Sequence, residues 1–166
     1  FTSHWYGFIP SMASGNIINI VFHSDKHQCL MFDISRYREE IKIKEKEYRS
    51  EHRYGLPLDI MLKSSNDFIQ SILSSIIAEI PYNWLICEGS SEQFYFDDEI
   101  QNNRLRIVPV GGAKEIKKIY NHLAVSYDEL KEKIRGTVIL LMDTDEQLLE
   151  FETKDYPKLH CYRIIN

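Results

Sequence analysis

The stretch VILLMDTDEQ, residues 138–147, decides the fold prediction, because a run of apolar residues leads directly into two aspartates. An uninterrupted apolar run of this kind is typical of a strand that is buried on both faces of a parallel sheet. Asp143 and Asp145, which are separated by one residue, would then lie where the strand ends. Open parallel sheets bind ligands at the carboxyl ends of their strands. The stretch therefore predicts both a type of sheet and the position of a site.

Three further apolar runs read as strands of the same sheet. They are WLICE at 84–88, LRIVPV at 105–110 and KLHCYRII at 158–165. Helical patterns precede or separate the runs, over residues 64–80, 91–101 and 114–123. Strands that alternate with helices predict an α/β fold, with a parallel sheet flanked by helices.

The longest helical pattern lies before the first of these strands. Apolar residues from Phe68 to Ile80 recur at helical spacing. Ser65 is a suitable N-cap for this helix, and Pro81 is expected to end it.

The first 63 residues form a separate part of the pattern. Residues 16–23 and 29–34 read as two strands joined by a polar turn, which predicts a hairpin. Residues 36–53 are dense in charges of both signs and predict either a solvated helix or an exposed ribbon. We therefore divide the chain into residues 1–63 and an α/β domain over residues 64–166.

The composition is that of a globular protein, with 166 residues, 43% hydrophobic residues, 27% charged residues and a net charge of −5. The negative charge argues against a simple cationic nucleic-acid binder, since such binding depends on Lys and Arg. No apolar run approaches the length of a membrane span, and no signal peptide is recognisable. We expect a cytoplasmic protein whose cysteines, Cys29, Cys87 and Cys161, are reduced core residues.

A third carboxylate is expected near the two aspartates. Glu88 ends the run 84–88 and is followed by Gly89, which allows a tight turn. If the two strands are neighbours, Glu88, Asp143 and Asp145 converge on one edge of the sheet. Three carboxylates at close range stay ionised only beside a cation, and their hard oxygens suit Mg²⁺ or Mn²⁺. The pattern therefore predicts a metal site open to phosphate oxygens.

Residues near these acids extend the candidate site. Glu92 lies one helical turn after Glu88 and is a candidate ligand of a second metal. Gly112 belongs to a Gly-Gly turn after the strand 105–110, and Lys114 follows as a candidate phosphate contact. Ordinary alternatives stay open, since an acid in a first helical turn and a lysine on a helix surface need no ligand.

The motifs ICEGSSEQFYF (86–96), VPVGGAKEI (108–116) and LLMDTDEQ (140–147) together resemble the Toprim domain, over residues 82–166. The resemblance implies a Rossmann-like parallel sheet in which Glu88, Asp143 and Asp145 bind Mg²⁺. The resemblance to OLD-type Toprim domains implies further acids and a lysine after the fourth strand. We therefore expect this domain to be incomplete at its C-terminus.

The opening FTSHWYGFIP (1–10) resembles the end of an ABC-type ATPase head, and implies that His4 contacts the γ-phosphate of ATP. An ATPase head followed by a Toprim domain is the arrangement of OLD-family nucleases, including anti-phage defence proteins and retron effectors. The sequence has no Gly-rich phosphate loop, so we expect ATP hydrolysis only in a longer parent protein.

The function expected from this resemblance is a Mg²⁺-dependent endonuclease that acts on DNA in anti-phage defence. The resemblance also implies a homo-oligomer formed through the ATPase head, and a possible partner such as a reverse transcriptase with its DNA or RNA. Two alternatives stay open. One is a phosphatase of the haloacid-dehalogenase type with Asp143 as nucleophile, although Gln147 departs from that motif. The other is a non-catalytic assembly module whose acids are structural.

Overall fold

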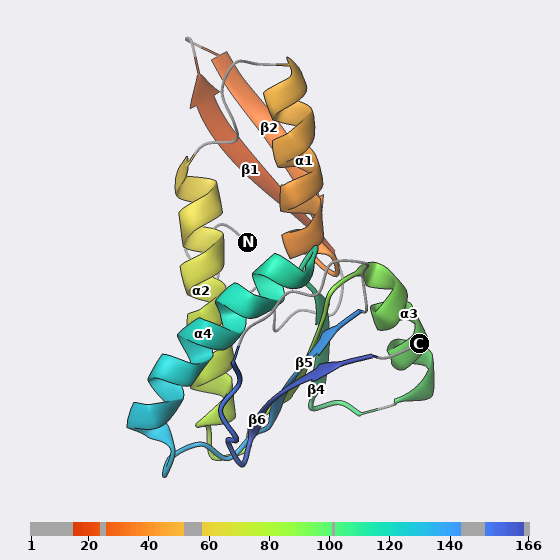
Figure 1. Cartoon of the computed structure of the whole chain (residues 1–166). Coiled ribbons are helices and arrows are strands. Elements are labelled where there is room, and N and C mark those ends of the chain that lie inside the picture. The colour runs from red at the N-terminus through yellow and green to blue at the C-terminus, as the bar shows by residue number, and fades with distance from the viewer. Residues whose placement is uncertain (1–14, 24–25, 52–57, 101, 144–151, 165–166) are drawn as a thin grey trace.

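The structure, a computed structural model, describes residues 15–23, 26–51, 58–100, 102–143 and 152–164 (Figure 1). In chain order the elements are β1 (Asn16–His23), β2 (Lys26–Asp33), α1 (Tyr37–Glu51), α2 (Leu58–Ile76), β3 (Asn83–Cys87), α3 (Ser90–Glu99), β4 (Leu105–Pro109), α4 (Ala113–Leu130), β5 (Val138–Met142) and β6 (Leu159–Arg163).

Four of the strands form one parallel sheet, in the order β4-β3-β5-β6. Within it, Ile86 of β3 lies between Val108 of β4 and Leu140 of β5. The predicted α/β fold with a helix-flanked parallel sheet is therefore confirmed, and it is consistent with a Rossmann-like fold. The residues of the proposed ATPase motif, including His4, lie outside the described residues.

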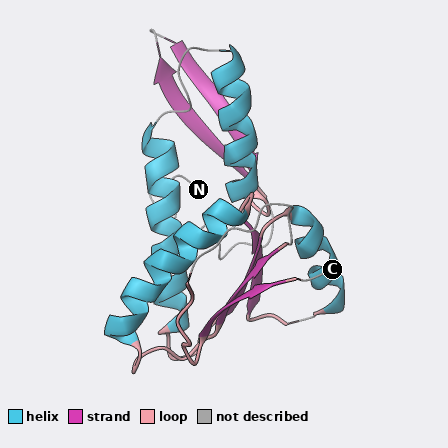
Figure 2. Ribbon diagram, viewed as in Figure 1, coloured by secondary structure: helices cyan, strands magenta, loops and turns pink. Residues whose placement is uncertain are grey.

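The helices cover opposite faces of the sheet, as Figure 2 shows. The chain moves one way along the sheet from β3 to β4 and the other way from β4 to β5. Since parallel crossovers are right-handed, the connecting helices α3 and α4 must lie on different faces. Helix α2 packs beside α4, and Gln93 of α3 donates a hydrogen bond to the carbonyl of Ile107 at 3.2 Å on the other face.

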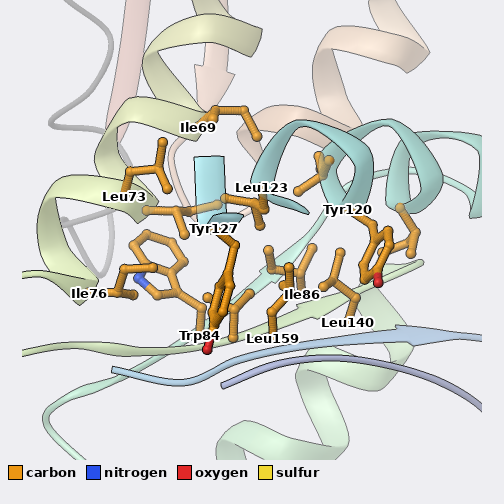
Figure 3. Close-up of a cluster of buried hydrophobic side chains, with 14 of the residues drawn as sticks. Ile69, Leu73, Ile76, Trp84, Ile86, Tyr120, Leu123, Tyr127, Leu140 and Leu159 are labelled. Carbon is orange, nitrogen blue, oxygen red and sulfur yellow. The ribbon is translucent and has the colours of Figure 1, made fainter. Parts of the chain in front are cut away.

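The main core lies between the sheet and the α2–α4 layer (Figure 3). Ile72, Ile86, Ile116 and Leu140 are completely buried in it. Full burial of one such side chain stabilises a fold by ~1.5–3 kcal/mol. Trp84 also donates its indole N–H to the hydroxyl of Ser75 at 2.8 Å, which fixes α2 against β3.

The N-terminal part is a hairpin covered by one helix. Strands β1 and β2 pair antiparallel, with Asn16 opposite Asp33. Helix α1 packs on one face of this pair, and Phe32, Ile34, Tyr37 and Ile41 form a small core between them. The predicted hairpin is confirmed, and the described part of the charged stretch 36–53 is a helix, Tyr37–Glu51, rather than a ribbon.

The predicted ends of the long helix are wrong. Helix α2 begins at Leu58, so Ser65 lies inside it and is not the N-cap. It ends at Ile76, before Pro81, because the carbonyl of Ile76 accepts hydrogen bonds from Arg135 and Gly136 instead of continuing the helix. Ile80, which continued the apolar pattern, is consequently exposed.

One of the three cysteines was also predicted wrongly. Cys87 is buried and Cys161 is partly buried, but Cys29 is exposed on the outer face of the hairpin. Alternation along β2 directs Cys29 away from α1, which covers only the other face. Among the described helices, none combines the length and apolar character needed to cross a membrane.

Candidate functional site

The candidate site lies at the edge of the sheet where β3, β4 and β5 end, which we call the carboxyl edge. Glu88 follows β3, Gly111 and Gly112 follow β4, and Asp143 follows β5. Because the strands are parallel and adjacent, these residues arrive at the same edge although up to 55 positions separate them in sequence.

Glu88 and Asp143 are joined directly. The backbone N–H of Asp143 donates a hydrogen bond to Oε2 of Glu88 at 3.1 Å. The Glu88 carboxylate therefore reaches across from β3 to the end of β5. The structure thus brings together two of the acids that the sequence singled out, and the carboxyl group of Asp143 is on an exposed residue.

The Gly111–Gly112 turn fixes the main chain of Glu88. The amides of Gly111 and Gly112 both donate to the carbonyl oxygen of Glu88, at 2.8 and 3.0 Å. Both glycines have positive φ, 76° and 123°, which L side chains rarely adopt. The Gly-Gly pair expected from the sequence is therefore used to hold the neighbouring strand end in place.

Glu92 has a local partner in this structure. Its Oε2 accepts hydrogen bonds from the backbone N–H of Gly89 at 3.1 Å and from the hydroxyl of Ser91 at 3.3 Å. Glu92 thereby caps the N-terminus of α3, where a carboxylate is also favoured by the helix dipole. This contact corresponds to the ordinary alternative, and a role of Glu92 in metal binding stays a prediction.

Of the remaining candidate residues, Lys114, Asp145 and His4, the structure describes Lys114. Lys114 lies in the first turn of α4, after Gly112, and is exposed. Asp145 and His4 lie outside the described residues. Within the described part of the chain, no group of three His, Cys, Asp or Glu side chains is arranged to hold a metal ion. The predicted triad includes Asp145 and stays a prediction.

A buried ion-pair cluster beside the carboxyl edge was missed from the sequence. Glu115, in the first turn of α4, is 9% exposed and accepts from three cations. Its carboxylate lies 3.3 Å from Nη2 of Arg38, 3.3 Å from Nζ of Lys42 and 2.8 Å from Nζ of Lys118. Arg38 and Lys42 both come from α1, so this cluster ties the N-terminal part to the sheet domain.

Burial and the ion pairs shift the pKa values of the residues in this cluster. Burial by itself would raise the pKa of Glu115, but the hydrogen bond from Lys118 and the charges of Lys42, Lys118 and Arg38 outweigh it and lower that pKa. Burial lowers the pKa of Arg38 and of Lys42, although Glu115 opposes the effect. Glu115 is therefore held ionised by its partners.

The layer below the acids is apolar. Cys87, directly before Glu88, is buried, and this burial raises the pKa of its thiol to about 12. Cys87 is thus a neutral packing residue and no nucleophile. The chemistry available at the carboxyl edge comes from oxygen ligands, which are the groups that Mg²⁺ and Mn²⁺ prefer.

Comparisons with protein-family models, with curated proteins and with solved structures gave no match to this chain.

Proposed function

We propose that the chain is the Toprim-type part of a metal-dependent endonuclease, with Mg²⁺ or Mn²⁺ held at the carboxyl edge. The observation that carries the proposal is the contact between Glu88 Oε2 and the amide of Asp143 at 3.1 Å. It means that two acidic residues, which follow different strands, lie at one edge of the sheet, at the position where parallel sheets bind ligands.

The residues fit a hard divalent cation. Glu88 and Asp143 supply carboxylate oxygens, and Asp145 is the proposed third ligand. When bound, the metal would neutralise charge on a phosphodiester and lower the pKa of an attacking water. Glu88 would be oriented by the two glycine amides that hold its carbonyl. Lys114, in the first turn of α4, would pair with a substrate phosphate. Cys87, directly before Glu88, is buried and belongs to the apolar core beneath the proposed site.

The biological setting rests on the sequence resemblance. We propose DNA as the substrate, an ABC-type ATPase head in the parent protein with His4 contacting ATP, and a role in anti-phage defence. Assembly as a homo-oligomer through the head, and partnership with a reverse transcriptase and its nucleic acid, belong to the same proposal.

Plasmid cleavage by the parent protein in Mg²⁺ or Mn²⁺ tests the nuclease activity. We expect Asp143→Asn to reduce cleavage to background, since it removes a charged ligand and keeps the side-chain size. Asp155→Asn is the matched control, because Asp155 is an exposed aspartate in the segment before β6, away from the carboxyl edge. Equal cleavage by the two variants would refute the proposal. A trapped aspartyl-phosphate on Asp143 would instead identify the phosphatase alternative.

A further inference from the structure

Helix α1 makes contact with the turn that supports the carboxyl edge. Nζ of Lys42 donates a hydrogen bond to the carbonyl oxygen of Gly111 at 3.0 Å. A Cβ added at Gly111 would lie 3.0 Å from Cδ of Lys42 and 3.4 Å from the Cα of Glu39. The first turns of α1 are therefore packed directly against the Gly111–Gly112 turn.

The same turns of α1 are anchored by charge. Lys42 and Arg38 both pair with Glu115, three residues after Gly112. Arg38 is 9% exposed, and its guanidinium lies 5.3 Å from the centre of the Phe68 ring. A buried charge without its partner is strongly unfavourable, so α1 cannot leave this position without exposing the whole cluster to water.

A continuous series of contacts runs from α1 to the acids. Lys42 holds the carbonyl of Gly111, and the amides of Gly111 and Gly112 hold the carbonyl of Glu88. The carboxylate of Glu88 accepts from the amide of Asp143. Every step of this series is a hydrogen bond between described residues, and it ends at the two proposed metal ligands.

The same end of α1 is also fastened to the hairpin. The amide of Asp33, the last residue of β2, donates to Oε2 of Glu40 at 2.7 Å. Oδ1 of Asp33 accepts from both the amide and the hydroxyl of Ser35, at 2.8 and 2.6 Å. Figure 1 shows the hairpin and α1 as one body that meets the sheet domain at the beginning of α1. A displacement of the hairpin would consequently move Lys42.

We propose that Lys42 is a positioning residue for the carboxyl edge, and that the hairpin–α1 unit sets the placement of Glu88 beside Asp143 through it. The consequence for metal affinity rests on the proposed function. The placement of the Gly111–Gly112 turn by Lys42 is independent of it.

Hydrogen exchange of single amides in the full chain tests the inference without any catalysis. In Lys42→Met we expect the amides of Gly111, Gly112 and Asp143 to exchange about tenfold faster, the scale for the loss of one hydrogen bond from a charged donor. The amide of Trp84, bonded to Thr137 at the opposite edge, should be unchanged. Lys46→Met is the matched control, since Lys46 is an exposed lysine of the same helix.

Titration of the same variants with Mn²⁺ supplies the second readout. We expect an affinity about tenfold weaker in Lys42→Met, the lower end of the range for groups that orient metal ligands. Lys42→Arg should recover both properties, because a guanidinium can also donate to the carbonyl of Gly111. Should Lys42→Met not fold, Lys42→Gln, which keeps a short donor, takes its place.

The outcomes separate the two proposals. Faster exchange with weaker Mn²⁺ binding supports both. If the unsubstituted protein binds no Mn²⁺, faster exchange in Lys42→Met supports the positioning by Lys42 and refutes the metal site. Unchanged exchange at Gly111, Gly112 and Asp143 overturns the inference, and so does faster exchange with unaltered Mn²⁺ affinity in a protein that binds the ion.

Discussion

The two edges of the parallel sheet, at the amino and the carboxyl ends of its strands, are held by different kinds of contact. At the amino edge, where β3 and β5 begin, backbone packs on backbone. The carbonyl of Ile76 accepts from the amides of Arg135 and Gly136 at 2.8 and 2.9 Å, and Oδ1 of Asn83 accepts from the amide of Thr137 at 2.8 Å. A Cβ added at Gly136 would overlap the carbonyl oxygen of Tyr82.

The contacts at the carboxyl edge involve more charged side chains. Glu88 and Asp143 present carboxylates there, and the space around Gly112 is open, with nothing within 4 Å of an added Cβ. The amino edge is therefore closed by tightly packed backbone, whereas the carboxyl edge carries the acidic residues of the proposed site. Substitutions at the amino edge should therefore lower the free energy of unfolding, whereas those at the carboxyl edge should change binding with little effect on stability.

The exception at the carboxyl edge is Glu115, and its removal should have the largest effect. Glu115→Gln leaves Arg38 and Lys42 without a counter-charge, and loss of one partner from a buried ion pair costs ~3–5 kcal/mol. Urea denaturation measures the change. Glu129→Gln, an exposed glutamate of the same helix, is the control and should cost less than ~0.5 kcal/mol. Equal stability of the two variants would show that the cluster does not hold α1.

The same carboxylate gives a pH dependence with a definite sign. Its folded pKa lies below the ordinary value of 4.5. The stability that it contributes is therefore complete above pH 4.5 and is lost as the pH falls through the lower folded pKa. The difference in unfolding free energy between the unsubstituted protein and Glu115→Gln should be constant above pH 4.5. It should shrink as the pH falls through the lower folded pKa of Glu115. A difference that grows on acidification would contradict the assignment.

A further prediction compares two glycines that each lie beside a strand. Gly136→Ala should destabilise the protein by ~3 kcal/mol, the upper part of the range for overpacking, because backbone and not a movable side chain occupies the space. Gly89→Ala should cost no more than ~1 kcal/mol, the scale for Ala at an N-cap, since the added Cβ would meet only side-chain ends, Oε2 of Glu92 at 3.3 Å and Oγ of Ser91 at 3.7 Å. Thermal unfolding of the two variants checks the contrast, and a reversed order would refute the division of the edges.

The smallest expected effects on stability come from two side chains that each connect β3 to β5. Asn83 does so at the amino edge and Glu88 at the carboxyl edge. Asn83→Ala removes the acceptor of the Thr137 amide and should cost ~1–2 kcal/mol. Glu88→Gln keeps an oxygen that can accept from Asp143, so stability should stay within ~0.5 kcal/mol while metal binding is lost. Denaturation with parallel Mn²⁺ titration checks both. Retained binding in Glu88→Gln would remove Glu88 from the proposed site.

The sheet could be predicted from the sequence because its signals are local. Each parallel strand is an apolar run, and the acids and glycines follow directly after three of them. Parallel pairing then forces Glu88 and Asp143 to one edge, although the order of the strands was not itself readable. The shared edge therefore follows from patterns that single segments carry, whereas the direct contact also required β3 and β5 to be neighbours.

The cluster around Glu115 could not be predicted in this way. Helix α1 carries charges on all sides, so its sequence does not indicate which face becomes buried. The contact of Arg38 with Glu115 joins residues 77 positions apart, and neither residue stands out within its own segment. The start of α2 was missed for a related reason, because Ser65 offered a capping residue inside a helix that begins at Leu58.

The most direct test of the central claim is the position of Mn²⁺ on the protein, followed by paramagnetic broadening of backbone amide signals. We predict the strongest broadening at Glu88, Gly111, Gly112 and Asp143, with much weaker broadening of the amides of Asn83 and Thr137 at the amino edge. In Asp143→Asn the broadening should disappear at the same ion concentration. Broadening that avoids the carboxyl edge, or that persists unchanged in Asp143→Asn, would contradict the account.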